Sequence, residues 1–343
     1  MLRLMRRSAK FSALCDNESE TKELPMANRP SEFALIAELF APLATTSGAF
    51  GLSDDAAIVP LRAGHDLIVT TDALVEGVHF LACDPPDAIA RKALRVNLSD
   101  LAAKSAEPAG YLLSLSLPQR IDRAWLEDFA RGLGEDQKAF AVPLLGGDTT
   151  ATPGPLSLTI TAMGHVPEGA MIRRSGAKLG DGVYVSGTIG DAGGGLAVLQ
   201  NGSGPAELIE RYRLPSPRLA LGRALRGVAG AAIDVSDGLL ADLGHIADVS
   251  RVRIAVEAAR IPRSAALRAL WGDTVDAIVR AATAGDDYEI AFTAAREERV
   301  MEAAGRAGIP VIRIGRVEGG AGLVLHDAQG REIAVARAGF THF

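Results

Sequence analysis

Stretches typical of strands and of helices alternate along almost the whole of this 343-residue chain. Segment 66–71 (DLIVTT) is a short apolar run, and segments 111–117 and 156–166 alternate apolar with polar side chains, as strands do. Segment 87–104 repeats apolar residues at helical spacing and is predicted to be an amphipathic helix. This alternation predicts an α/β or α+β fold of helices layered on sheets, but periodicity does not decide the strand order.

The length indicates two domains, because one hydrophobic core rarely extends beyond ~250–300 residues. A turn-rich stretch at 167–182 interrupts the pattern, and strand and helix signals begin again at Val183. We therefore predict an N-terminal domain at 31–166 and a C-terminal α/β domain at 167–343.

The first 30 residues differ from the rest of the chain. Met1–Lys10 carries four basic residues, and Asp16–Glu23 is a mixed-charge stretch without periodicity. A secretory signal would need a longer apolar core, and the acidic residues argue against an organellar transit peptide. We expect residues 1–30 to be a disordered extension, with Met26 as an alternative start.

The composition argues against several classes of partner. The net charge is −6 and the body of the chain has no basic run, which disfavours nucleic acid and anionic membranes. No apolar stretch reaches the ~18–20 residues of a membrane span. Two cysteines provide neither a disulfide framework nor a thiolate metal site. We expect a cytoplasmic protein.

Six short motifs place Asp beside Gly, Ser, Thr or another small residue, and none of the six contains Lys or Arg. A carboxylate without a cationic side chain must be solvated, cap a helix or bind a hard metal ion. Repeated Asp with Ser and Thr suits Mg²⁺ bound through oxygen, not zinc or a redox metal. The motifs are Ser53-Asp54-Asp55, Thr70-Thr71-Asp72, Asn97-Leu98-Ser99-Asp100, Gly146-Gly147-Asp148-Thr149-Thr150, Asp234-Val235-Ser236-Asp237-Gly238 and Gly285-Asp286-Asp287.

Each motif taken singly also has a structural interpretation. Asp148 could be a turn residue, and Asp237 a turn residue or the N-cap of a helix predicted at 239–249. Asp72 could simply end a strand. Asp100 is harder to explain in this way, because helical spacing puts it on the same side as Ile89 and other apolar residues, which favours a ligand or partner.

No Gly-x-x-x-x-Gly-Lys-Ser/Thr loop or protein-kinase signature occurs in the sequence. Segment 190–195 (GDAGGG) could offer backbone N–H groups to a phosphate, but close packing of a helix explains it equally well. Arg173 and Arg174 open a turn and could hold a phosphate or lie in solvent. His65 and His79 alone are more typical of structural histidines.

At these motifs the chain resembles the thiamine-monophosphate kinase family of the aminoimidazole-ribonucleotide-synthetase-like superfamily, from about Glu32 to Phe343. TTDALVEGVHF followed by NLSDLAA is highly specific, whereas Asp-x-Ser-Asp-Gly is shared more widely. The other matching phrases are SDDAAIV, LLGGDTT, RRSGAKLGD, AIDVSDGLLADLGHI, GDDYEIAFT and a terminal GFTHF.

The resemblance implies a two-domain α/β protein whose N-terminal domains bind ATP and Mg²⁺ and pair in a homodimer, the two sheets forming a β-barrel. It implies transfer of a phosphoryl group from ATP to thiamine monophosphate. The implied Mg²⁺ ligands are Asp55, Thr70, Thr71, Asp72, Asp100, Asp148, Asp234 and Asp237. The implied ATP contacts are Gly147, Asp148, Arg174 and Ser236, and the implied thiamine contacts are His79 and Asp286.

Three positions depart from the family pattern. Ser53 and Ala284 each replace a glycine, which are small changes. Arg337 stands where an aromatic residue commonly packs on the substrate, and Phe340 is an alternative for that contact.

The reaction brings together two anionic phosphates, and one pair of unit charges about 4 Å apart costs about 4 kcal/mol at an effective dielectric constant near 20. Clustered Asp residues holding Mg²⁺ would offset this repulsion, and the ionised phosphate nucleophile needs no general base. The alternatives are another ATP-activating enzyme of the superfamily and a nucleotide- or Ca²⁺-binding module without turnover.

Overall fold

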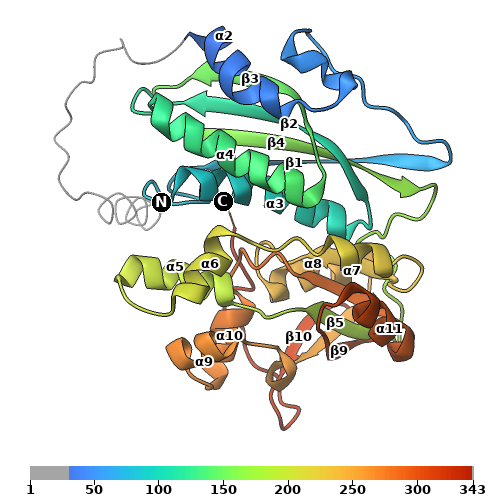
Figure 1. Ribbon diagram of the computed structural model, residues 1–343. Helices are drawn as coiled ribbons and strands as arrows, with labels where there is room; N and C mark the ends of the chain where they lie inside the picture. Colours follow the sequence, from blue (N-terminus) through green and yellow to red (C-terminus); the bar gives the residue numbers. More distant parts are fainter. Residues whose placement is uncertain (1–30, 342–343) are drawn as a thin grey trace. The chain divides into compact units, whose positions relative to one another are not determined.

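The computed structural model describes residues 31–341, so the expected disordered extension at 1–30 lies outside the described residues. The chain forms two compact units (Figure 1). The first consists of the described residues up to Ala63 together with Val69–Asn97 and Pro108–Gly164. The second consists of Gly64–Ile68, Leu98–Glu107 and the residues from His165 onward. Within residues 31–341, no helix is both long enough and apolar enough to cross a membrane.

The first unit contains a four-stranded sheet in the order β1–β4–β2–β3, in which β2 and β3 are parallel. In β2, Tyr111 and Leu113 are buried whereas Leu112 and Ser114 are exposed, so only one face is covered. The strands are β1 (His65–Val75), β2 (Glu107–Leu117), β3 (Leu144–Ala151) and β4 (Ser157–Pro167).

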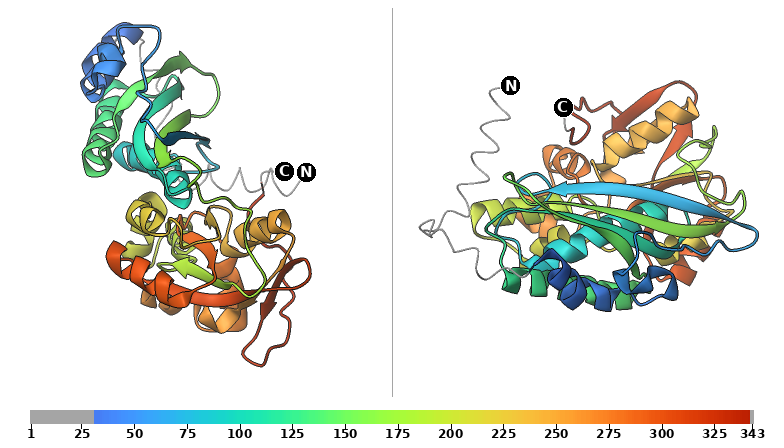
Figure 2. Two further views of the ribbon diagram at one scale, coloured as in Figure 1. Left: turned by 90° about the vertical axis from the view of Figure 1, so that its right-hand side faces the viewer. Right: turned by 90° about the horizontal axis from the view of Figure 1, so that it is seen from above.

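Two helices of this unit, α3 (Pro86–Ala103) and α4 (Arg123–Phe140), supply its core. Figure 2 shows α4 and the strands as separate layers. The side chain of Asp122 caps α4 by accepting the Trp125 N–H at 2.9 Å. The helices approach so closely that a Cβ on Gly132 would lie 2.5 Å from the Asp87 carbonyl oxygen.

Segment 31–40 is α-helical for only one turn, α2 (Glu32–Leu35), followed by a π-helical turn at Ile36–Phe40. The Ser31 hydroxyl caps α2 by accepting the Ala34 N–H. Pro42, which cannot donate a backbone hydrogen bond, lies in the 3₁₀ turn that follows at Ala41–Leu43.

The second unit contains a mixed six-stranded sheet in the order β10–β7–β9–β5–β8–β6. Only the β10–β7 pair is parallel, and the other pairs are antiparallel. The strands are β5 (Gly182–Ser186), β6 (Ala231–Asp234), β7 (Arg253–Glu257), β8 (Ile290–Ala294), β9 (Val311–Glu318) and β10 (Gly322–His326).

Helix α8 (Leu239–Ser250) packs across β6, β7, β8 and β10, and its buried Leu239, Leu243 and Ile246 join the core of the sheet. The helix predicted at 239–249 is confirmed as α8, whereas α6, α9 and α10 were not predicted. The remaining helices are α5 (Asp191–Asn201), α6 (Ala206–Arg213), α7 (Leu219–Ala224), α9 (Ala265–Trp271), α10 (Val275–Ala282) and α11 (Glu297–Ala307).

Candidate active site

Two of the Asp motifs lie on the edge strands of the four-stranded sheet. Thr70, Thr71 and Asp72 belong to β1, whereas Gly147 and Asp148 belong to β3. Strands β4 and β2 separate these edges, so the sheet does not make Asp72 and Asp148 neighbours. Asp148 is not a turn residue, as one interpretation had it, because its motif is a strand paired in parallel with β2.

The motif aspartates of this unit are accessible to solvent. Asp55 and Asp148 are exposed, and Asp72 is half-buried. The Asp148 carboxylate accepts the Thr149 N–H at 3.0 Å, and Asp54 accepts the Asp55 N–H at 2.8 Å. Neither Asp55 nor Asp148 forms an ion pair with Lys or Arg within residues 31–341. Exposed carboxylates without cationic partners remain available to a metal ion.

Gly147 has a structural role in addition to the predicted contact with ATP. A Cβ at this position would lie 1.8 Å from the carbonyl oxygen of Leu113, its register partner in β2. Only glycine therefore lets β3 pair closely with β2 beside Asp148.

His79 follows β1 and is held by the backbone around it. Its Nδ1 accepts the Val75 N–H at 3.0 Å, so this ring nitrogen carries no proton. The Lys92 ammonium donates to the His79 carbonyl at 2.9 Å. Lys92 is buried, and the His79 side chain is half-buried.

In the second unit, Asp234 at the end of β6 lies near Asp100 in the last turns of α3. Asp234 is 4 % exposed. Its pKa is raised well above the ordinary value, chiefly by burial and then by the charges of Asp100 and Asp242. The charge of Lys104 acts in the opposite direction. The structure thus brings Asp100 and Asp234 together, and binding of a cation would relieve their mutual repulsion.

Lys104 is a member of this group that the sequence analysis missed. Its ammonium donates to the Ala232 carbonyl at 2.8 Å. Burial is the main reason that the pKa of Lys104 is lowered, to about 8, and the charge of Arg174 lowers it further. The negative charges of Asp234 and Asp100 act in the opposite direction and raise this pKa. The available signal was its position four residues after Asp100, which puts both side chains on one side of the helix.

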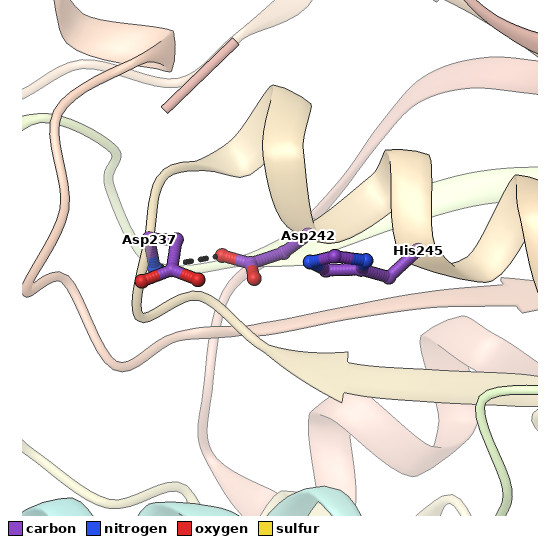
Figure 3. A group of neighbouring side chains, drawn as sticks. All are labelled: Asp237, Asp242 and His245. Atoms are coloured by element: carbon purple, nitrogen blue, oxygen red, sulfur yellow. Dashed lines mark hydrogen bonds between the residues drawn. The ribbon is translucent and has the colours of Figure 1, made fainter. Parts of the chain in front are cut away.

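Asp237, Asp242 and His245 form a cluster in which one potential ligand atom from each residue lies within 4.8 Å of the others (Figure 3). The Asp242 carboxylate accepts the N–H groups of Asp237 and Gly238 at 3.1 and 3.2 Å. Burial, followed by the charge of Asp237, raises the pKa of Asp242 to about 7. Asp242, not Asp237, therefore secures the start of α8, and the N-cap interpretation of Asp237 is wrong.

Two further segments of the second unit meet the Ser236–Asp237 turn. The Asp286 N–H donates to the Ser236 carbonyl at 2.8 Å, and the Phe340 N–H donates to the Asp237 carbonyl at 2.9 Å. The Phe340 ring is 41 % exposed, whereas the Arg337 guanidinium donates to the Thr341 hydroxyl at 2.6 Å. Asp286, Ser236 and Asp237 thus form one group, with an exposed aromatic ring on the segment beside it.

The glycine-rich segment 190–195 serves helix packing. A Cβ on Gly195 would lie 2.0 Å from the Leu208 carbonyl oxygen of α6. The Asp287 carboxylate accepts the N–H groups of Gly190 and Ala192 at the start of α5, where a phosphate would bind. The packing interpretation of this segment is therefore correct. Arg174 is exposed, and its carbonyl accepts a hydrogen bond from the Ser250 hydroxyl.

Known proteins share this arrangement of motifs. Residues 53–166 match the model of the AIR synthase related protein N-terminal domain, and residues 178–328 match that of its C-terminal domain. Thiamine-monophosphate kinase of Caulobacter vibrioides is 46% identical over 93% of this chain and 92% of its own length. The chain belongs to the thiamine-monophosphate kinase family. This membership confirms the resemblance drawn from the Asp motifs.

Solved structures of thiamine-monophosphate kinases agree. The enzyme from Stenotrophomonas maltophilia K279a has 43% sequence identity and a TM-score of 0.79, covering 88% of this chain and 98% of that one. A structure described as AaThiL complexed with AMPPCP and TMP has 30% identity and a TM-score of 0.73, covering 95% of this chain and 100% of that one. The two-domain α/β fold with mixed sheets is therefore confirmed.

Proposed function

We propose that this protein transfers the γ-phosphoryl group of ATP to thiamine monophosphate, forming thiamine diphosphate and ADP. The observation that carries the proposal is the 46% identity to a thiamine-monophosphate kinase over 93% of the chain. The related structure described with AMPPCP, an ATP mimic, and with TMP supports the same pair of substrates.

The reaction balances without a proton acceptor. An ionised phosphate oxygen of thiamine monophosphate forms the new bond to the γ-phosphorus. The bond from that phosphorus to the bridging oxygen breaks, and its electron pair leaves with ADP. No general base is required, so the protein's contribution is positioning and electrostatic stabilisation.

The acidic residues fit Mg²⁺ because they offer oxygen ligands, and exposed Asp55 and Asp148 form no ion pair with Lys or Arg within residues 31–341. Bound Mg²⁺ would supply positive charge between the two phosphates. The residues proposed to hold it are Asp55, Thr70, Thr71, Asp72, Asp100, Asp148, Asp234 and Asp237.

The substrates are assigned to separate groups of residues. We assign ATP to Gly147, Asp148, Arg174 and Ser236. His79, whose ring is held by the Val75 N–H, and Asp286 bind the thiamine moiety in this proposal. Phe340 is offered as the aromatic contact in place of Arg337, because its half-exposed ring lies beside the Asp237 turn.

A homodimer that closes the four-stranded sheet into a barrel accounts for the uncovered face of that sheet. Val69 on β1 is 57 % exposed and Leu112 on β2 is 37 % exposed. Their burial against a second copy would remove apolar surface from water. Sedimentation of the wild-type protein tests this, and Val69→Asp should shift a dimer toward monomer.

The deciding experiment measures thiamine diphosphate and ADP formed by the purified protein from thiamine monophosphate and MgATP. Equal amounts of the two products are expected. Nucleotide binding without product would favour a non-catalytic module. ADP formed only with an amide, carbamoyl or selenide substrate would favour another enzyme of the superfamily.

A further inference from the structure

The turn that carries Asp286 contains two backbone conformations that side chains rarely adopt. Asp286 has φ 72° and Tyr288 has φ 51°, and neither residue is glycine. Ala141 and Arg251 also have positive φ, but they end helices, where this conformation is common. Asp286 and Tyr288 lie instead between helix α10 and strand β8. Strain of this kind persists only where the surroundings enforce it, and it clusters at ligand sites.

The residues that alternate with them, Asp287 and Glu289, are buried and tightly bound. Asp287 is 1 % exposed and accepts the Gly190 and Ala192 N–H groups at 2.6 and 3.2 Å. Glu289 is fully buried and accepts hydrogen bonds from Arg211 at 2.9 Å, from the Arg218 Nε at 2.7 Å and from the Ser186 hydroxyl at 2.6 Å. These anchors fix the backbone on both sides of Tyr288.

The two strained residues contact each other, and both contact the segment that leads into the Ser236–Asp237 turn. The Tyr288 hydroxyl lies 3.3 Å from Oδ1 of Asp286 and donates to it. The backbone N–H groups of Asp286 and Tyr288 donate to the carbonyls of Ser236 and Val235, each at 2.8 Å. Both side chains are half-buried, so each retains surface that a ligand can contact.

We propose that Tyr288 is a positioning residue for the thiamine-binding carboxylate of Asp286. Its hydroxyl orients that carboxylate, and its ring forms a wall for a cationic heteroaromatic group. The inference rests on the proposed function, since thiamine monophosphate carries a positively charged thiazolium ring. A carboxylate beside an aromatic ring attracts such a cation through charge and through the electrons of the ring face.

The test is a double-mutant cycle with Tyr288→Phe and Asp286→Asn in the full-length enzyme. Tyr288→Phe should raise KM for thiamine monophosphate by about three- to tenfold, because one hydrogen bond to a charged group is lost. KM for ATP and kcat should change less than about twofold. In the Asp286→Asn background, Tyr288→Phe should have almost no further effect, because the two residues act as one unit.

Tyr184→Phe is the matched control. Tyr184 lies in β5 of the same unit and stacks on Phe292 at a ring-centroid distance of 5.4 Å, away from the 285–289 turn in sequence. It should leave both KM values unchanged. If Tyr288→Phe does not fold, as judged by circular dichroism, Tyr288→Trp, which keeps a ring and a donor, is tested in the same two backgrounds.

Two results would overturn the inference while leaving the proposed function intact. One is an unchanged KM for thiamine monophosphate in Tyr288→Phe. The other is an equal effect of that substitution in both backgrounds, which would indicate a purely structural role. A wild-type protein that forms no thiamine diphosphate would overturn the proposed function and this inference with it.

Discussion

The acids of the two units differ in their surroundings, although they occur in similar short phrases. In the first unit, Asp55 and Asp148 are exposed, and the Asp148 carboxylate accepts a hydrogen bond from the adjacent Thr149 N–H. In the second, Asp234, Asp287 and Glu289 are at most 4 % exposed and lie in networks of hydrogen bonds and charges.

This difference shows that aspartates in similar motifs can have two different roles. An exposed carboxylate keeps its hydration, so it costs little to maintain and remains ready for a cation. A buried carboxylate must be satisfied by donors, and it therefore holds the chain in one conformation. In the second unit, Asp242 and Asp287 secure turns, and the neighbouring Asp237 and Asp286 remain accessible.

The largest expected effect is the loss of activity when divalent ions are removed. Excess EDTA should lower turnover by about a thousandfold or more, because the repulsion between the phosphates is no longer offset. Added Mg²⁺ should restore turnover. ADP release is the measurement, with far-UV circular dichroism to show that the fold persists. Full turnover in EDTA would contradict the metal-binding role proposed for the exposed aspartates.

Asp148→Asn should reduce kcat by about a hundredfold or more while changing the thermal midpoint by less than about 2 °C, because the side chain is exposed. Asp72→Asn is expected to behave similarly. Asp128→Asn is the matched control, since this exposed acid on α4 pairs with Arg131 at 3.3 Å and belongs to none of the motifs. Near-normal turnover of Asp148→Asn at ordinary Mg²⁺ would show that the metal assignment is wrong.

Glu289→Gln tests the structural side of the comparison. It should lower the free energy of unfolding by about 3 kcal/mol, because two largely buried guanidinium groups lose their counter-charge. Glu318→Gln removes an exposed pair with Arg316 and should cost less than about 1 kcal/mol. Urea denaturation measures the free energy of unfolding of both variants. Equal losses in the two variants would contradict the distinction between buried and exposed acids.

The smallest expected effect is the pH dependence contributed by Asp287. Burial raises the pKa of Asp287 well above its ordinary value, against the Gly190 amide, Arg211 and the Ala192 amide, which lower it. The unfolded chain releases this proton near pH 4 and the folded protein at higher pH, so the folded state binds more protons between these values.

The contribution of Asp287 to stability is therefore present at low pH and is lost as the pH rises toward the folded-state pKa. The advantage of wild type over Asp287→Asn in unfolding free energy should shrink by at most about 1.4 kcal/mol per pH unit. Urea titrations from about pH 4.5 to 7 measure it. Asp273, whose pKa is lowered chiefly by its hydrogen bond to Arg268, should show the opposite sign in Asp273→Asn.

Strong local patterns were sufficient to predict most elements. The helix at 87–104 is α3 at Pro86–Ala103, and the strand at 66–71 lies within β1 at His65–Val75. Strand β3 was missed because Gly-Gly-Asp-Thr-Thr has the composition of a turn, and only pairing with β2 extends it. Helices α6, α9 and α10 are only seven or eight residues long, and such short helices are stabilised by tertiary packing more than by propensity.

For the candidate site, the sequence named the acids but could not assign their surroundings. Three contacts become visible only in the fold: Lys104 with Asp234, Asp242 with the Asp237 turn, and Tyr288 with Asp286. Spacing offered a signal for Lys104 alone.

By itself, the sequence determined the chemistry of this protein: oxygen ligands without basic partners in the motifs, an alternation of helices and strands, and membership in a kinase family. The tertiary structure decided which of those acids stay hydrated and which become buried anchors. The reason is physical. Whether a carboxylate is ionised and available depends on its desolvation and its donors, and both are set by residues that the chain brings from elsewhere.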